Sequence, residues 1–191
     1  YHYKTGCSFQ DLADCAQGIE RIAVLRADVD NLGEAFVSGF ANEENHNRYV
    51  TLSRTSTFSR KLSLFFKYYI NNLLEQGSFY LKEKEDKRRA AVIVYSGGDD
   101  LFVVGSWDDI IGFAVDLYYS LKKYSQGTLT ISGGIGIYPP KFPISVMAKQ
   151  TGALEDAAKE VDGKNAITLF DERYSFHWSE LIQEVIEEKV Q

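Results

Sequence analysis

The feature that most constrains the fold is a pair of apolar runs separated by a short polar one. The runs AAVIVY and LFVVG flank SGGDD within residues 90–105. Apolar runs of this length are typical of buried strands, and Gly97 and Gly98 supply the positive φ that a tight turn requires. The sequence therefore predicts a β-hairpin whose tip carries two acids, Asp99 and Asp100.

Hydrophobic periodicity predicts the remaining elements. The run IERIAVLRAD indicates a buried strand that ends at a carboxylate, Asp28. We further expect a helical turn or two within 30–40, helices over 49–76, 107–124, 144–161 and 176–190, and strands over 19–28, 128–138 and 166–170. This order predicts an α+β fold in which helices cover one face of a mostly antiparallel sheet.

Glycines and charges between these elements predict local features. Gly77 is expected to cap the helix that precedes it, because glycine readily adopts the left-handed conformation common at helix ends. The mixed-charge run KEKEDKRR at 82–89 is typical of a solvated connector. Gly133, Gly134 and Gly136 lie inside a predicted strand, where they indicate close backbone approach or a bulge.

Composition excludes several classes of protein. The chain has 191 residues, a formal charge of −6 and 45% apolar residues. This acidity disfavours a free-standing nucleic-acid binder, which needs Lys and Arg to neutralise phosphates. The apolar content is too high for disorder, and no run approaches the ~18–20 apolar residues of a membrane-spanning helix. One soluble domain is expected.

The ends of the sequence and its cysteines bear on context. Only two cysteines occur, Cys7 and Cys15, and no secretory signal opens the chain, so we expect a cytoplasmic location. The chain starts at Tyr1 without an initiator Met, which predicts a segment of something longer. The two cysteines are interpreted as free thiols, with half of a zinc site as the alternative.

Three carboxylates carry the predicted chemistry. If the first strand neighbours the hairpin, Asp28, Asp99 and Asp100 meet at one edge of the sheet. Clustered, partly desolvated carboxylates repel one another unless a cation lies among them, and oxygen ligands suit Mg²⁺ or Mn²⁺. Two such ions about 3.5–4 Å apart can hold the attacking and leaving oxygens of a nucleotidyl transfer.

Each of these signals also has a plain structural interpretation. Gly-Gly-Asp is more often a turn than an active site, and the combination with Asp28 and the Asn31-Leu32-Gly33 helix start favours a site. Lys159 and Lys164 are interpreted slightly in favour of ordinary surface lysines near a helix end. The alternative is that they neutralise a polyphosphate as pyrophosphate leaves.

Four motifs in order resemble a known family. RADVDNLG at 26–33, YSGGDD at 95–100, ISGGIGIYPPKFPI at 131–144 and AAKEVDGKNAITLF at 157–170 resemble the second palm domain of the large, polymerase-like subunit of type III-A CRISPR effector complexes. The resemblance spans about residues 9–180. It implies a ferredoxin-like βαββαβ core, shared with GGDEF proteins and nucleotide cyclases, plus a C-terminal helix.

The resemblance implies a metal-dependent synthase that makes cyclic oligoadenylate messengers from ATP in antiviral defence. Asp28, Asp99 and Asp100 would hold Mg²⁺ or Mn²⁺. The glycines of the hairpin tip would admit the nucleotide backbone, and the two lysines would face its phosphates. The implied nucleotide-binding positions are Asn31, Gly33, Ser96, Gly97, Gly98, Ser132, Lys159 and Lys164, with Asp30 as a supporting residue.

The resemblance also implies boundaries and partners. Residues 1–18 would end a preceding linker domain, 19–173 would form the palm, and 174–191 would lead to a following domain. The implied partners are ATP, the first palm of the same subunit, other effector subunits and, through the complex, guide and target RNA, with no membrane. In that family the two palms share the site, so weak or absent activity is expected of this palm alone.

Two other functions stay open. The palm could be a scaffold of the effector complex with vestigial ATP binding. A diguanylate cyclase is disfavoured, because such enzymes usually have Glu where Asp100 stands, and Arg89 begins no Arg-x-x-Asp motif. No His-Asp dipeptide occurs in the chain, so the single-stranded DNase of the family's nuclease domain is not expected here.

Overall fold

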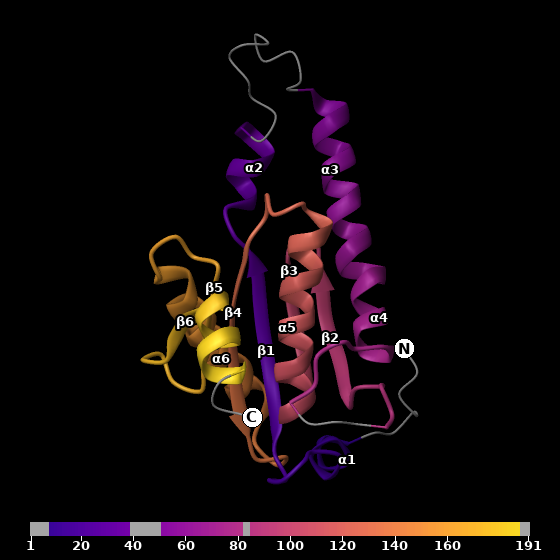
Figure 1. Ribbon diagram of the computed structural model, residues 1–191, viewed down its shortest axis with the longest axis vertical. Helices are drawn as coiled ribbons and strands as arrows, with labels where there is room; N and C mark the ends of the chain where they lie inside the picture. Colours follow the sequence, from indigo (N-terminus) through magenta and orange to yellow (C-terminus); the bar gives the residue numbers. More distant parts are fainter. Residues whose placement is uncertain (1–7, 39–50, 82–84, 188–191) are drawn as a thin grey trace.

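The computed structural model describes residues 8–38, 51–81 and 85–187. Its centre is a six-stranded sheet in the order β2-β3-β1-β4-β5-β6 (Figure 1). All pairs are antiparallel except β4 with β5. The strands are β1 (Ile22–Val29), β2 (Ala91–Gly97), β3 (Asp100–Ser106), β4 (Ile131–Tyr138), β5 (Ala166–Leu169) and β6 (Ser175–His177).

The helices occur close to where periodicity predicts them. They are α1 (Phe9–Asp14), α2 (Leu32–Ser38), α3 (Leu52–Leu64), α4 (Ile70–Glu75), α5 (Trp107–Tyr124), α6 (Ile144–Glu160) and α7 (Trp178–Glu180), with π-helical segments η2 (Phe65–Tyr69) and η3 (Leu181–Glu187). The predicted helix over 49–76 is thus one continuous helix with a π-helical insert. None of the helices in the described ranges is long and apolar enough to cross a membrane.

The predicted α+β class and the βαββαβ core are confirmed. In the core, β1, β2, β3 and β4 are arranged as β2-β3-β1-β4, and the helices between them pack on one face. Residues of β1 at alternate positions, such as Leu25, belong to the same larger apolar cluster as Phe66 of η2 and Phe113 of α5. The hairpin of β2 and β3 therefore lies directly beside β1, as the motif order predicted.

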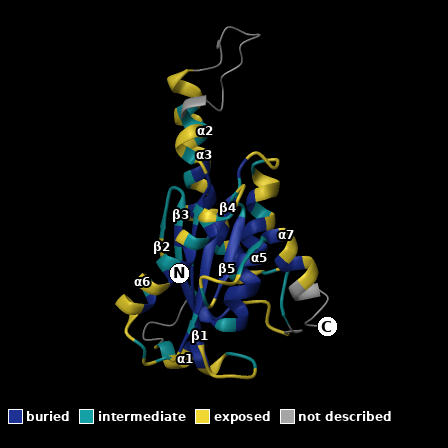
Figure 2. Cartoon of the chain, turned by 90° about the vertical axis from the view of Figure 1, so that its left-hand side faces the viewer, coloured by how far each residue is buried: buried dark blue, intermediate teal, exposed yellow. Residues whose placement is uncertain are grey.

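The expectation that helices cover only one face is wrong. α1 and α6 pack on the opposite face (Figure 2), where Leu12 and Met147 belong to the same smaller apolar cluster as Val24 of β1. The reason is visible in β1, whose run Ile22–Leu25 is fully buried without a polar alternation, as a strand covered on both sides should be. Gly134 allows the approach of α6, because a Cβ there would lie 2.5 Å from the Leu154 Cβ atom.

The last predicted helix begins later than expected. Residues 175–177 form β6, an edge strand that pairs with β5, and the helical segment starts only at Trp178. The Trp178 side chain is buried, and its indole N–H donates to the Ile131 carbonyl at 2.8 Å. Trp178, Leu181 and Ile182 therefore belong to the core of the sheet, and the proposed boundary at 174 stays a prediction.

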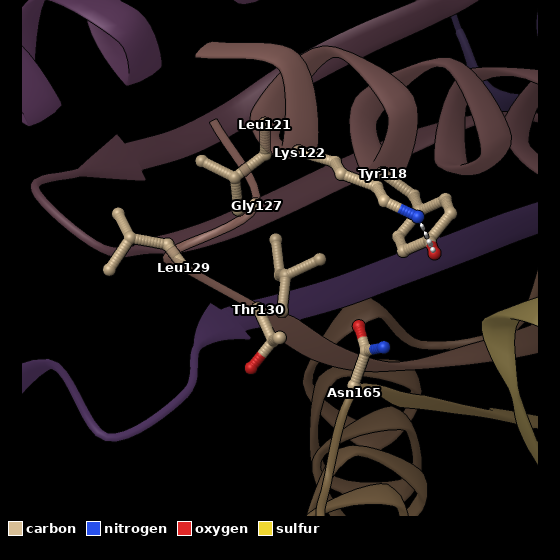
Figure 3. Close-up of a pocket in the computed structure, with 8 residues that line it drawn as sticks. Tyr118, Leu121, Lys122, Gly127, Leu129, Thr130 and Asn165 are labelled. Carbon is tan, nitrogen blue, oxygen red and sulfur yellow. Dashed lines mark hydrogen bonds between the residues drawn. The ribbon is translucent and has the colours of Figure 1, made fainter. Parts of the chain in front are cut away.

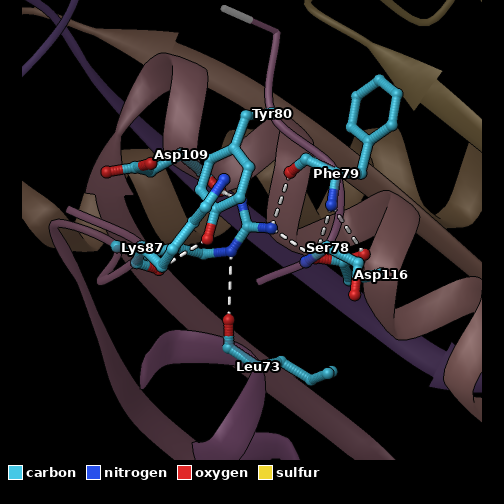
Figure 4. A network of polar contacts seen from close by, with 8 residues as sticks. Leu73, Ser78, Phe79, Tyr80, Lys87, Asp109 and Asp116 are labelled. Carbon is cyan, nitrogen blue, oxygen red and sulfur yellow. Dashed lines mark hydrogen bonds and ion pairs between the residues drawn. The ribbon is translucent and has the colours of Figure 1, made fainter. Parts of the chain in front are cut away.

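Arg89 is the exception within the charged run at 82–89. Residues 82–84 lie outside the described part of the chain, but Arg89 is only 3% exposed. Its guanidinium pairs with Asp116 of α5 and donates to the carbonyls of Leu73, Phe79 and Asp109 (Figure 4). A solvated connector was therefore the wrong interpretation at this residue, because four acceptors replace its water shell.

Gly77 has a different role from the predicted cap. The helix α4 ends at Glu75 with Gln76 as its C-cap, and Gly77 does not have positive φ. A Cβ at Gly77 would lie 2.3 Å from an Arg89 guanidinium nitrogen. The residue therefore makes room for the buried arginine.

Candidate functional site

The strand register places two of the predicted acids in one row. Asp28 of β1 lies directly opposite Asp100 of β3 and, on its other side, opposite Ser132 of β4. Gly97 of β2 continues the row beyond Asp100. Directly opposed residues in antiparallel strands have Cα atoms about 4.5–5.5 Å apart, and their side chains project from the same face. Asp28 and Asp100 therefore face the α6 side of the sheet together.

Asp99 lies in the turn of the hairpin beside that row. Gly98 has a φ of 71° and supplies the positive φ that was predicted, whereas Gly97 is paired within β2. The Val29 N–H donates to the Asp99 carbonyl at 3.2 Å, which ties the turn to the end of β1. Burial and the negative charges of Asp28 and Asp100 raise the pKa of the Asp99 carboxyl. The three acids thus interact electrostatically, as expected.

Lys159 of α6 joins this cluster through an ion pair that was not predicted. Its ammonium donates to the Asp28 carboxylate at 2.7 Å and to the Glu155 carboxylate at 2.8 Å. Burial alone would lower the pKa of Lys159, but its hydrogen bonds to Asp28 and Glu155 and their charges outweigh it and raise the pKa. Lys159 therefore stays protonated and touches a site carboxylate.

Glu155 and Arg26 complete a chain of alternating charges. The buried Glu155 carboxylate accepts from Lys159 and pairs with the Arg26 guanidinium at 3.0 Å. Neither residue was among the predicted site residues. Two patterns could have indicated them: Glu155 stands four residues before Lys159 on a helix, and Arg26 stands two residues before Asp28 on a strand.

Tyr95 is a further residue that the sequence analysis did not single out. Its side chain is 53% exposed, and its hydroxyl would lie 2.1 Å from a Cβ at Gly97. The charge of Asp100 raises the pKa of Tyr95, together with burial and a hydrogen bond to the same carboxylate. The glycine at position 97 therefore leaves space for a phenol that contacts a predicted metal ligand.

Asn31 and Lys164 meet at the same edge of the sheet. The Lys164 ammonium donates to the Asn31 side-chain carbonyl at 2.6 Å, and both residues have positive φ. Gly33 lies exposed in the first turn of α2, with open space where a Cβ would be. The structure brings these three predicted positions to the end of β1. Within the described part of the chain, no hydrogen bond or ion pair joins them to the three acids.

Of the two predicted serines, only Ser132 lies in the row of the acids. Ser96 pairs with Leu101, which faces the larger apolar cluster, and its hydroxyl donates to the Phe66 carbonyl of η2 at 2.5 Å. Its side chain is therefore on the opposite face from Asp100. Ser132 shares the row of Asp28, but it is fully buried and accepts from the Ala166 N–H at 3.4 Å.

A small pocket opens on the other face at this edge. It has a volume of about 110 Å³ and is lined by the end of α5, residues 127–131 and Asn165 (Figure 3). The nearby Asp30 is buried, and one carboxylate oxygen accepts from the Asn165 N–H at 3.1 Å. Its other oxygen has no hydrogen-bond donor within the described part of the chain. The pocket contains none of the predicted site residues.

The structure bears on the predicted metal site in two opposing ways. Among the described residues, no group of three or more His, Cys, Asp or Glu side chains is already arranged to hold a metal ion. The donor chemistry still fits a hard divalent cation, because Asp28 and Asp100 lie on neighbouring strands and their charges, with burial, raise the pKa of Asp99 in the adjoining turn. Cys15 is free and exposed, and Cys7 lies outside the described residues, so the zinc alternative is not tested.

Comparison with known proteins gives a consistent result. The sequence matches the family described as Cas10/Cmr2, second palm domain, over residues 21–168. A Mycobacterium tuberculosis relative, named CRISPR system single-strand-specific deoxyribonuclease Cas10/Csm1 (subtype III-A), is 50% identical over 98% of this chain and 23% of its own length. A Streptococcus thermophilus relative of the same name is 47% identical over 91% of this chain and 21% of its own. The chain spans less than a quarter of these relatives.

Solved structures share the fold. Csm1 in T. onnurineus superposes with a TM-score of 0.81 and 28% identity, covering 96% of this chain and 26% of that one. A Csm1-Csm4 cassette in complex with one ATP gives 0.78 and 29%, covering 92% and 26%. The cassette in complex with cA4 gives 0.78 and 28%, covering 92% and 25%.

Proposed function

Because the chain belongs to the Cas10/Cmr2 second-palm family, we propose that it is a nucleotidyltransferase palm that binds ATP and takes part in making cyclic oligoadenylate. Pyrophosphate leaves in each addition. The observation that carries the proposal is the row formed by Asp28 and Asp100, with Asp99 in the adjoining turn. Solved relatives of the same fold are described in complex with ATP and with cA4, which supports nucleotide binding by this palm.

A divalent cation, Mg²⁺ or Mn²⁺, is part of the proposal. Asp28, Asp99 and Asp100 would hold it, and when bound it would neutralise charge on the reacting phosphate and activate the attacking hydroxyl. The chain's own residues then have separate tasks. Lys159 supplies positive charge beside the acids, and the open space at Gly98 allows the backbone near the nucleotide.

The wider assignment follows the same reasoning. Solved relatives named Csm1-Csm4 support other effector subunits as partners of this palm. We propose that a first palm, guide RNA and target RNA complete the assembly, and that it acts in antiviral defence in the cytoplasm. The −6 charge is consistent with RNA contacts supplied by other subunits.

A scaffold with vestigial ATP binding is the second candidate, and one contact favours it. The ion pair with Lys159 lowers the electrostatic cost of keeping Asp28, so that the acids could persist without a metal ion. The two candidates differ in what the acids do when target RNA is present.

The test is synthesis of cyclic oligoadenylate from ATP by the complete effector complex with target RNA bound. We expect Asp99→Asn/Asp100→Asn to lower the rate at least about 100-fold, the scale of losing a group that stabilises transition-state charge. Asp14→Asn on α1, at the far end of the sheet from α2, is the control and should leave the rate unchanged (Figure 1). Equal rates in all three forms, or no product from wild type, would favour the scaffold.

A further inference from the structure

The contact between Lys159 and Asp28 has a chemical consequence for the site. A lysine that serves only the phosphates would point toward them, but this ammonium lies 2.7 Å from an acid of the proposed metal site. The carboxylate and the ammonium are 24% and 29% exposed, so water and ions reach both groups. The Lys159 ammonium is therefore a cation that already lies at Asp28 and is supplied by the protein itself.

Glu155 holds the ammonium in this position. Its carboxylate is 8% exposed and contacts Lys159 through one oxygen and Arg26 through the other. Gly152 gives Arg26 its space, because a Cβ there would lie 2.9 Å from a guanidinium nitrogen. Glu155 is therefore fixed, and it keeps one partner for Lys159 whether or not Asp28 is available.

The charges of this group balance without a metal ion. Asp28, Lys159, Glu155 and Arg26 alternate in sign along the chain of contacts. A divalent cation that takes Asp28 as a ligand must displace the ammonium or repel it at short range. The displaced ammonium keeps its hydrogen bond to Glu155. The N–H that it had donated to Asp28 becomes free, and an anionic phosphate oxygen can accept from it.

We propose that Lys159 is a resident counter-ion of Asp28 that the divalent cation replaces, and that the released ammonium then binds the phosphates of the nucleotide. Glu155 is the positioning residue on which Lys159 pivots between the two partners. This inference rests on the proposed metal and nucleotide site. It predicts that the cation and the nucleotide each favour binding of the other, since each frees the group that the other needs.

The test is a pair of binding measurements on the complete large subunit. Mn²⁺ binding without nucleotide is followed by the electron paramagnetic resonance of free Mn²⁺, and only sites that Asp28→Asn removes are counted. Binding of a non-hydrolysable ATP analogue is measured separately in excess chelator. The variants are Lys159→Met, Lys159→Gln and Glu155→Gln. Lys149→Met, on the exposed first half of α6, makes the same change of charge away from Asp28.

Removing the Lys159 ammonium is expected to change the affinities for Mn²⁺ and for the nucleotide in opposite directions. Removing the ammonium should tighten Mn²⁺ binding at least about threefold, the scale of a partly exposed ion pair, and should weaken the metal-free nucleotide by a similar factor. Glu155→Gln should weaken Mn²⁺ binding, because Lys159 then has only Asp28 as an ionic partner. Lys149→Met should change neither affinity.

Each other outcome overturns a distinct statement. If both Lys159 variants bind Mn²⁺ as wild type does, or more weakly, the counter-ion exchange is wrong while the metal site stands. If Lys149→Met matches Lys159→Met, the effect is that of net charge and the exchange is also wrong. If no form shows Mn²⁺ sites that depend on Asp28, the metal site of the proposed function fails, and the inference fails with it.

Discussion

At the scale of single residues, Asp99 is an acid whose environment opposes its charge. It sits in the turn that closes the hairpin, next to two carboxylates, and the lysine that compensates Asp28 is a weaker influence on it. A raised pKa in the folded state means that the protonated carboxyl favours folding and the ionised one opposes it. The stability associated with Asp99 is therefore present at low pH and lost as pH rises through its folded pKa.

Asp99→Asn should accordingly stabilise the metal-free protein at pH 7. Like charges at partly exposed positions cost about 0.5 kcal/mol after solvent screening, which corresponds to a rise of about 1–2 °C in Tm for a chain of this size. The gain should vanish under acidic conditions, where wild-type Asp99 is protonated. Thermal unfolding followed by circular dichroism at pH 7 and under acidic conditions measures the difference in Tm between the variant and wild type. A lower Tm for the variant at pH 7 would refute the repulsion.

The site residues differ in how far the sequence could predict them. Asp28 and Asp100 were predictable because strand ends and hairpin tips are local patterns, and neighbouring strands bring them together. Successive residues of a strand point to opposite faces of the sheet. This alternation places the Ser96 side chain on the face away from the acids. The partner of Lys159 could not be predicted, because Asp28 is 131 residues away and the contact depends on which face α6 covers.

At the scale of elements, the buried arginine links the helices to the hairpin of β2 and β3. Arg89 immediately precedes the strand segment that leads into β2, and it binds the end of α4, the segment at 78–79 and α5 at once. Asp116 also accepts from the N–H groups of Ser78 and Phe79. The start of β2 is therefore fixed by a polar cluster whose charged side chains, Arg89 and Asp116, are buried.

Arg89→Met should be strongly destabilising. It leaves the buried Asp116 carboxylate without its ionic partner, a change that typically costs about 3–5 kcal/mol. Urea unfolding measures the loss. Arg88→Met is the matched control, because Arg88 pairs with Asp86 at the surface, and the free energy of unfolding should stay close to that of wild type. Similar values for the two variants would contradict the role given to Arg89.

Periodicity predicted which elements form better than how they pack. The hairpin and the helices over 107–124 and 144–161 were expected within a residue or two, since their apolar spacing is regular. The strand β6 was missed because three residues carry too little pattern to compete with the helix that follows. The π-helical insert at 65–69 was missed because its apolar residues still fall near helical spacing.

At the scale of the whole molecule, the two faces of the sheet carry different features. One face holds the large apolar cluster, and the other holds the smaller one under α1 and α6, with the acids beside Lys159 of α6 at the end of β1. The −6 charge that argued against nucleic-acid binding includes the three carboxylates at this edge, where the proposed function places a divalent cation. The fold class, unlike the partners, follows from the chain alone.

The central claim is that this edge binds ATP through a divalent cation. Calorimetry of ATP with Mn²⁺ on the complete large subunit and on its Asp28→Asn/Asp100→Asn variant tests it most directly. We predict that wild type binds ATP at least about tenfold more tightly with Mn²⁺ than in chelator, and that the variant loses this dependence, the loss of roughly 1.4 kcal/mol or more. Equal, metal-independent binding by both forms would contradict the account.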